Sequence, residues 1–168
     1  IAEKLKQEEF FLFLGSGPSF GTALFSAAKA VEASGVIALG QDVEEWAHIQ
    51  FFYRRSGIPT FLLVPPGNSF SRAQELAGAM KAVNAFTIGV LGEGAGKLAD
   101  QLDQTLTLPG RLPEVLSPLL YGLPGSLFAY HLSEAKGEVF FRTDRSVDRV
   151  GPILRSHILR ALPDPTPP

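Results

Sequence analysis

The sequence predicts an α/β fold, a doubly wound, mainly parallel five-stranded sheet flanked by helices. Short apolar runs alternate with helix-forming segments, and the connections between them are short, which indicates a parallel sheet with helices on both faces. The run Phe10–Leu14 is apolar throughout, as expected for a strand buried on both faces. Ligands of such sheets bind beyond the carboxyl ends of the strands, where we expect Gly15–Ser19, Gly40–Asp42 and Pro65–Ser71 to lie.

The first 39 residues show this alternation of helices and strands. Ala2–Glu9 is a polar lead-in that we expect to be helical, and the strand Phe10–Leu14 follows it. In Ser19–Ser34 alanines recur at helical spacing, and Gly35 comes next, where helix C-termini favour glycine. The short apolar run Val36–Leu39 predicts a second strand.

A helix is expected to begin after Asp42. Asp42 and Glu45, three residues apart, have capping-box spacing, and we read Glu45 as part of this first turn rather than as a catalyst. We expect the helix to run to about Arg55. Gly57 then interrupts it, and the apolar run Thr60–Val64 predicts a third strand.

The remaining elements are expected in the second half of the chain. Ser71–Val83 reads as a helix, Ala85–Leu91 as a fourth strand and Leu106–Leu108 as a short fifth strand. From Pro113 to about Ala135 the sequence reads as a long apolar helix. Its internal prolines, Pro118 and Pro124, could each mark an end or a kink of this helix. We expect Pro163–Pro168 to be a disordered tail.

Composition excludes several classes of function. The chain has 168 residues, which fits one domain, and its net charge of −2 gives no reason to expect a nucleic-acid partner. The absence of cysteine excludes thiol catalysis and cysteine metal sites, and no apolar run is long enough to span a membrane. We expect a cytoplasmic protein. Because the sequence begins with Ile1, we also expect it to be part of a longer chain.

Four motifs in order resemble those of a known family. Gly15–Leu24 matches a Gly-Arg-Gly-x-x-Tyr-Pro-x-Ala-Leu motif after the first strand, and Ala27–Glu32 matches Ala-Leu-Lys-x-x-Glu. Glu45–His48 matches a Glu-x-x-His at the same spacing, and Leu119–His131 resembles an apolar helix ending in Leu-Leu-Ala-Tyr-His. The chain, to about Lys136, resembles a sugar isomerase (SIS) domain, and most closely the second SIS domain of glutamine–fructose-6-phosphate aminotransferases.

The resemblance implies a domain organisation and partners. It implies a three-layer, flavodoxin-like or Rossmann-like sandwich, with residues 1–162 forming one SIS domain, the C-terminal half of a two-SIS protein. It implies a sugar-phosphate ligand such as fructose 6-phosphate or glucosamine 6-phosphate, no metal and no cofactor. A second SIS domain or a homodimer is the expected partner, and the aromatic residues Phe51, Phe52 and Tyr53 are expected to contribute to such a contact.

Lys29, Glu32 and His48 are the candidate catalytic residues. Aldose–ketose isomerisation moves a proton between two carbons through an enediol, which a carboxylate can carry while an ammonium stabilises the oxyanion. The resemblance assigns these roles to Glu32 and Lys29, which we place one turn into their helix, and ring opening to a His48 donated across a dimer interface. The alternatives are a solvent-exposed i, i+3 ion pair for Lys29 and Glu32 and an interfacial or partly buried histidine for His48.

Small and hydroxylated residues are the candidates for binding substrate. Gly15, Ser16, Gly17 and Ser19 form a loop at a helix N-terminus, where we expect free amides suited to an oxyanion. The alternative is an ordinary tight strand–helix turn. Ser69 and Ser71, with Arg72, are a second candidate for phosphate contact. In the two-SIS synthases the first SIS domain holds most of the phosphate, so we expect the isolated chain to be inactive.

The C-terminal segment departs from the family's pattern. The synthases carry a lysine in their tail, and Arg145 is its match here. Arginine cannot form a Schiff base, which argues against an imine step and favours a related isomerase or deaminase. Two other functions stay open: a non-catalytic SIS domain that binds a sugar phosphate to regulate, and a structural partner of a catalytic domain.

Overall fold

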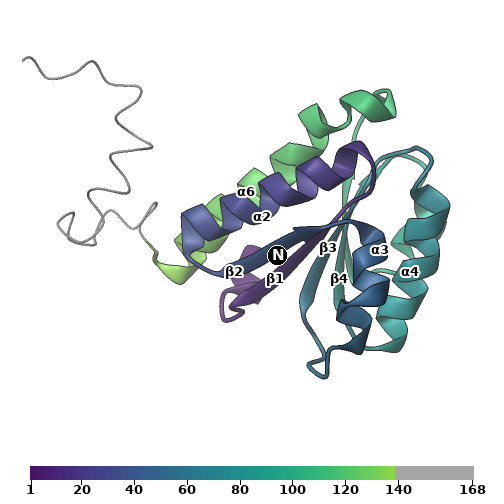
Figure 1. Ribbon diagram of the computed structural model, residues 1–168. Coiled ribbons are helices and arrows are strands. Elements are labelled where there is room, and N and C mark those ends of the chain that lie inside the picture. Colours follow the sequence, from purple (N-terminus) through teal and green to yellow (C-terminus); the bar gives the residue numbers. More distant parts are fainter. Residues whose placement is uncertain (139–168) are drawn as a thin grey trace, which may run out of the picture.

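A computed structural model describes residues 1–138 and confirms the predicted α/β class (Figure 1). In this part of the chain one parallel sheet has the order β2-β1-β3-β4-β5, formed by β1 (Phe10–Leu14), β2 (Ile37–Gln41), β3 (Pro59–Val64), β4 (Phe86–Gly92) and β5 (Gln104–Leu108). The α-helices are α1 (Ala2–Leu5), α2 (Pro18–Ser34), α3 (Val43–His48), α4 (Phe70–Ala82), α5 (Gly96–Ala99) and α6 (Pro118–Lys136). Two 3-10 turns, η1 (Gln50–Phe52) and η2 (Glu114–Leu116), complete the set.

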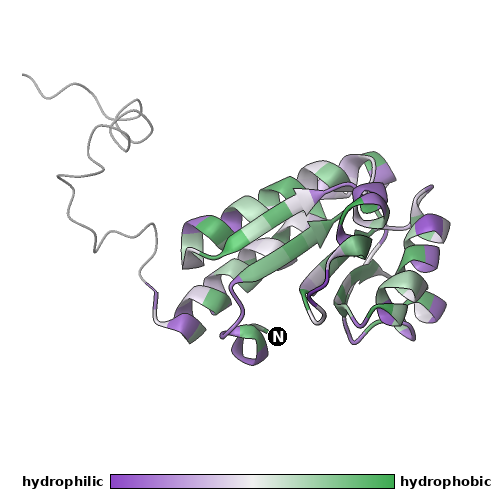
Figure 2. Ribbon diagram, turned by 60° about the horizontal axis from the view of Figure 1, so that its bottom comes forward, coloured by the Kyte–Doolittle hydropathy of each residue, from purple (hydrophilic) through white to green (hydrophobic). Residues whose placement is uncertain are grey.

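Each face of the sheet carries its own apolar core. Phe11 and Phe13 of β1 point to the face covered by α1, α2 and α6, whereas Leu12 and Leu14 point to the face covered by α3, α4 and α5. This alternation follows from the period of two of a β-strand, and it explains why β1 is apolar at every position. Figure 2 shows the central strands as a continuous hydrophobic band between the helices.

Stacked aromatic rings fix α6 against the sheet. The ring centroids of Phe13 and Phe61, on β1 and β3, lie 4.7 Å apart and nearly parallel. Phe128 of α6 packs on Phe61 at 4.6 Å and on Phe11 at 5.4 Å. Such aromatic contacts add to the burial of their large apolar surfaces. They hold the long C-terminal helix of the described region directly over the centre of the sheet.

The strand order creates a switch point between β1 and β3. Leu12 pairs with Leu39 of β2 on one side and with Thr60 of β3 on the other. The helix after β1, α2, lies on one face of the sheet, and the helix after β3, α4, lies on the other. The two loops therefore diverge beyond the strand ends, and a switch point of this kind is where ligands of this topology bind.

Three predicted helices differ from the structure. The lead-in expected to be helical over Ala2–Glu9 is helical only over Ala2–Leu5. The helix expected to reach Arg55 ends at His48, because Ile49 leaves helical geometry (φ −124°, ψ −65°) and the chain continues as the 3-10 turn η1. The helix expected from Pro113 begins at Pro118, after a separate 3-10 turn, and continues through Pro124. None of the described helices is long and apolar enough to cross a membrane.

Candidate functional site

The loop after β1 is tied to the loop after β2. The amide of Gly15 donates to the carbonyl of Gln41 at 3.1 Å, and the Ser16 hydroxyl donates to Asp42 Oδ1 at 3.2 Å. The same Asp42 oxygen accepts the amide of Glu44 at 3.0 Å and so caps α3. This confirms Asp42 as the predicted cap. It also means that the Ser16 hydroxyl already donates its hydrogen bond to a carboxylate.

The loop offers fewer free amides than we expected from the sequence. The amides of Ser19 and Phe20 donate to the carbonyls of Ser16 and Gly17, each at 3.1 Å. Gly15 is needed because a Cβ there would overlap the Ser19 backbone, and Gly17 has φ +55°, which favours glycine. The structure therefore supports the tight-turn interpretation of the glycines, and it leaves the amides of Ser16 and Gly17 as donors for an anion.

The second serine of the loop is buried. Ser19 is 0% exposed, and its hydroxyl has no hydrogen-bond partner within the described residues. A ligand that approaches this loop from solvent would meet Ser16, which is half-buried, before it met Ser19. Ser19 as a substrate-binding residue thus stays a prediction that requires the loop to open.

Lys29 and Glu32 form an ion pair on the surface of α2. Lys29 Nζ donates to Glu32 Oε2 at 2.5 Å, and the two side chains are 37% and 42% exposed. Lys29 also lies over the ring of Phe25, 5.5 Å from its centroid, one turn earlier on the same helix face. The pair has the geometry of the exposed i, i+3 ion pair that was the alternative to a catalytic role.

The placement of this pair one turn into the helix was wrong. Lys29 comes 11 residues after Pro18, the first residue of α2, so it lies in the fourth turn. At 1.5 Å per residue this is about 16 Å along the helix axis from the loop after β1. Glu32 lies further still. The Lys29–Glu32 ion pair and the small-residue loop after β1 therefore lie at two separate places on the domain.

The helices next to the pair carry exposed apolar side chains. Leu119 and Leu123 of α6 are 74% and 55% exposed, and Phe25 of α2 is 44% exposed. Gly122 brings α6 close to Phe25. Large apolar residues gathered on two neighbouring helices are typical of surfaces that contact another protein.

His48 lies at the end of α3 and points to solvent. Its side chain is 76% exposed, and Nε2 is 4.0 Å from Glu44 Oε2. The partly buried alternative for this histidine is therefore wrong in the isolated domain. The neighbouring Phe51, Phe52 and Tyr53 are 42%, 72% and 40% exposed.

A charged cluster links α3 to α4 beside His48. Arg72 donates to both carboxylate oxygens of Glu44, at 2.5 and 2.9 Å, and pairs with Glu75 at 2.7 Å. The Arg72 hydrogen bond lowers the pKa of Glu44, and the Glu44 and Glu75 carboxylates raise the pKa of Arg72. Arg72, expected beside a phosphate, is thus already bound to two carboxylates.

The loop after β3 already holds a carboxylate that sequence reasoning missed. Ser69 occupies the N-cap position of α4, but its side chain makes no capping hydrogen bond. Ser71 lies exposed in the first turn of α4. Glu114 of η2 reaches this loop from 46 residues away and accepts the amide of Asn68 at 3.2 Å. Gly67 permits the approach, because a Cβ there would overlap the Glu114 carboxylate. A phosphate bound by Ser69 or Ser71 would have this negative charge as a neighbour.

Arg145 and the tail at Pro163–Pro168 lie outside the described residues, so their predictions are untested. Within residues 1–138, no three His, Asp or Glu side chains come together as a metal site requires. The candidates that the structure does place thus fall into four groups: the β1 loop, the Lys29–Glu32 pair on α2, the His48 end of α3, and Ser69 and Ser71 in the loop after β3.

Comparison with known proteins decides the family. No model of a protein family matches the sequence. Over 137 residues, 82% of this chain, the sequence is 34% identical to the glutamine–fructose-6-phosphate aminotransferase (isomerizing) of Pyrococcus horikoshii. The chain is a sugar isomerase (SIS) domain. It spans 22% of the length of that relative, about a fifth.

Solved structures share the SIS fold. The C-terminal domain of the Francisella tularensis glucosamine-fructose-6-phosphate aminotransferase superposes with a TM-score of 0.72 at 20% identity, covering 83% of this chain and 39% of that one. The tagatose-6-phosphate ketose/aldose isomerase of Escherichia coli superposes with a TM-score of 0.65 at 15% identity, covering 86% of this chain and 43% of that one. The expected three-layer SIS architecture is thereby confirmed.

Proposed function

We propose that this SIS domain supplies the acid–base pair of a sugar-phosphate isomerase-type enzyme whose phosphate loop comes from a second SIS domain. One observation carries the proposal: the Lys29–Glu32 pair is exposed on the surface of α2, about three turns from the loop after β1. A pair so placed can serve a substrate held by a partner. The sequence relative, named as an isomerizing aminotransferase of a fructose 6-phosphate, supports this substrate class.

In this proposal Glu32 moves the proton and Lys29 provides the compensating charge. The Glu32 carboxylate takes a proton from the hydroxyl-bearing carbon next to the carbonyl and returns it to the former carbonyl carbon. The proton of that hydroxyl group moves to the former carbonyl oxygen, so that no net proton is gained or lost. The Lys29 ammonium stabilises the negative oxygen of the enediol. Substrate binding would have to separate the two side chains, whose ion pair at the surface is worth little.

The apolar surface around Phe25, Leu119 and Leu123 is the proposed contact with the second SIS domain or a second copy. Phe25 lies one turn before Lys29, whose Nζ is 5.5 Å from the Phe25 ring centroid, so a partner seated on Phe25 would also cover Lys29 and exclude water from it. His48, on the opposite side of the sheet, would then act in the site of another copy by opening the sugar ring through acid–base transfer.

Deuterium exchange tests the proposal. The full-length protein is incubated with fructose 6-phosphate or glucosamine 6-phosphate in D2O, and NMR follows deuterium entering C1 or C2. Glu32→Gln should slow exchange at least about a hundredfold. Glu3→Gln is the matched control, because Glu3 forms the same kind of i, i+3 ion pair with Lys6 at 2.5 Å. Undiminished exchange in Glu32→Gln would reject Glu32 as the base. Sugar-phosphate binding without exchange in any variant would favour the regulatory SIS domain.

Mixing inactive variants tests the role of His48. If each site combines Glu32 of one copy with His48 of another, a mixture of Glu32→Gln and His48→Asn chains regains part of the activity. Recovery is measured from the cyclic sugar, since only ring opening needs the imidazole in this scheme. A mixture as inactive as its components would contradict a site shared between copies.

A further inference from the structure

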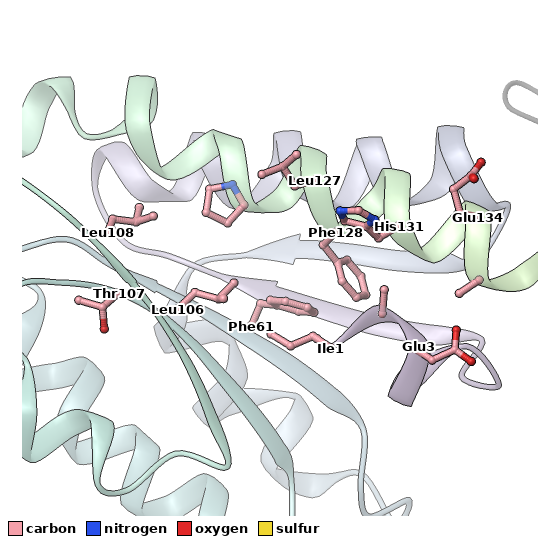
Figure 3. A pocket seen from close by; sticks show the side chains of 13 residues that line it. Ile1, Glu3, Phe61, Leu106, Thr107, Leu108, Leu127, Phe128, His131 and Glu134 are labelled. Carbon is pink, nitrogen blue, oxygen red and sulfur yellow. The ribbon is translucent and has the colours of Figure 1, made fainter.

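A pocket lies at the carboxyl ends of β3 and β4. Its volume is about 330 Å³, which lies within the range of small-ligand sites, and its lining comes from the ends of both strands and the loops that follow them. It shares no lining residue with the larger apolar groove between α6 and β5, which contains the rings of Phe61 and Phe128 (Figure 3). The described residues do not show what covers that groove, whereas the smaller pocket is bordered by charged groups.

Most of the side chains that line the pocket are apolar. Val64 at the end of β3 is 1% exposed, Phe70 begins α4, and Ala95 just before α5 is 8% exposed. The ring of Pro66 lies against Gly92 of β4, where a Cβ would overlap it. The two loops therefore approach each other closely at one side of the pocket. Such a lining suits the apolar part of a small ligand.

Two carboxylates lie at this pocket. Glu93 lines it and is exposed, and the carboxylate of Glu114 lies against Gly67, another lining residue. Oε2 of Glu114 accepts the amide of Asn68, whereas its Oε1 has no hydrogen-bond partner among residues 1–138. Neither carboxylate forms an ion pair with a described residue. Two negative charges without a paired cation favour a positively charged ligand.

The positive groups near the pocket leave these carboxylates unpaired. Lys97 and Arg111 are the cations closest to them in the sequence, and neither forms an ion pair within the described part of the chain. Arg72, in the first turn of α4, is already bound to Glu44 and Glu75. The start of α4 carries a partial positive charge of about half a unit, which is less than the charge of the two carboxylates. The balance of charge at the pocket therefore favours a cation.

A buried phenol adds a free hydrogen-bonding group beside the pocket. Tyr121 of α6 is 3% exposed, and its hydroxyl lies next to the Pro66 ring, 2.8 Å from the position that a Cβ of Gly92 would take. This hydroxyl has no hydrogen-bond partner among the described residues. Buried polar groups are normally hydrogen-bonded, so an unpaired phenol against the wall of a pocket is a second indication of a ligand there.

We propose that this pocket binds a small organic ammonium ion, a primary amine on an apolar body of about one ring. The ammonium group donates to Glu93 and Glu114, and the apolar body packs against Val64 and Ala95. This ligand differs in class from the sugar phosphate of the proposed function. The pocket also lies outside the Lys29–Glu32 pair, so its occupancy does not depend on catalysis by the domain.

Titration of the full-length protein with benzylamine at about pH 7 tests the proposal. Methyl groups are labelled with carbon-13, and the NMR signals of Val64 and Ala95 should shift saturably, with a dissociation constant in the millimolar range for so small a ligand. Benzyl alcohol and benzoate, which have the same ring without the positive charge, should bind at least about fivefold more weakly. Equal affinities for the three compounds, or no saturable shift of Val64 and Ala95, would overturn the proposal. Shifts confined to Leu106 and Leu127 would place the amine in the groove of Figure 3 and would also overturn it.

Charge-removing variants identify the groups that hold the amine. Glu114→Gln keeps an acceptor for the Asn68 amide and should weaken benzylamine binding at least about threefold. Glu93→Gln should have a similar effect, and neither variant should change the affinity for benzyl alcohol. Glu45→Gln is the matched control, because Glu45 is an exposed carboxylate of α3 without an ion pair among residues 1–138. An equal loss in all three variants, or no loss in the two pocket variants, would show that these carboxylates do not form the site.

Discussion

The carboxylate of Glu114 lies directly against the backbone of Gly67, in the space that a side chain at position 67 would fill. Its Oε2 accepts the neighbouring amide of Asn68 at 3.2 Å. The contact joins η2, just before α6, to the loop after β3. It therefore ties the two faces of the sheet together at the strand ends, where ligands of this fold bind.

Replacing Gly67 should break this connection. Gly67→Ala places a Cβ on the Glu114 carboxylate, so the carboxylate must move away and the Asn68 amide loses its partner. Because the hydrogen bond is exposed and the carboxylate ends a flexible side chain, we expect a loss of no more than about 1 kcal/mol in the free energy of unfolding, measured by denaturant titration. Gly78→Ala in α4 is the control, because nothing lies within 4 Å of its Cβ position. The control should gain up to about 1 kcal/mol, since alanine favours a helix more than glycine does. Equal effects of the two changes would contradict the account.

Removing the charge of Glu114 should reveal whether the β3 loop can bind phosphate. If Ser69 and Ser71 contact phosphate, Glu114→Gln lowers the repulsion and increases the affinity for inorganic phosphate several-fold. Phosphorus NMR titration of the full-length protein measures the affinity. Adding Ser69→Ala to Glu114→Gln should cancel the gain. Unchanged affinity in Glu114→Gln would remove this loop from the candidate phosphate sites.

Tyr121 should make the domain sensitive to alkaline pH. Burial raises the pKa of this phenol from 10.0 to about 12. A pKa raised by folding gives stability that is complete below pH 10, the unfolded value, and is lost as the pH rises towards 12. The loss is of the order of 2 kcal/mol.

Chemical denaturation between about pH 9 and pH 12 measures this effect, because that range brackets the two pKa values. Tyr121→Phe has no phenol to ionise, so its stability should fall less steeply over that range. Tyr130→Phe on the same helix is the control, because Tyr130 is 46% exposed. Identical slopes for wild type and Tyr121→Phe would show that another group causes the alkaline loss.

Local patterns in the sequence predicted the regular elements better than the contacts between them. Phe10–Leu14 could be predicted as a buried strand because all five residues are apolar, and Asp42 as a cap because of its position before an acidic turn. The helix end at His48 could not, since the aromatic residues that follow suit a helix and a 3-10 turn equally. The four-residue helix α5 was missed because it has less than two turns of periodicity.

The candidate site shows the same division. Lys29 and Glu32 could be paired from their i, i+3 spacing, and the structure confirms the pairing. Glu114 could not be placed beside Gly67, because the two are far apart in the sequence and no local pattern links them. Glu44 likewise meets Arg72 only through packing of α3 on α4. The proposed roles of Glu32 and His48 could not be read from these contacts, because the proposal completes both sites with a second domain or copy.

Close packing of α2 on α6 gives the last prediction. A Cβ at Gly125 would overlap the buried side chain of Ser26, whereas a Cβ at Gly122 would have the ring of Phe25 as its nearest neighbour at 3.7 Å. Gly125→Ala should therefore force the helices apart and cost about 1–3 kcal/mol of stability. Gly122→Ala, one turn earlier on the same helix, should be neutral or stabilising. Thermal unfolding of both variants measures the difference. Because α2 carries Glu32, Gly125→Ala should also slow any Glu32-dependent exchange, and equal stability of the two variants would show that the helices can separate freely.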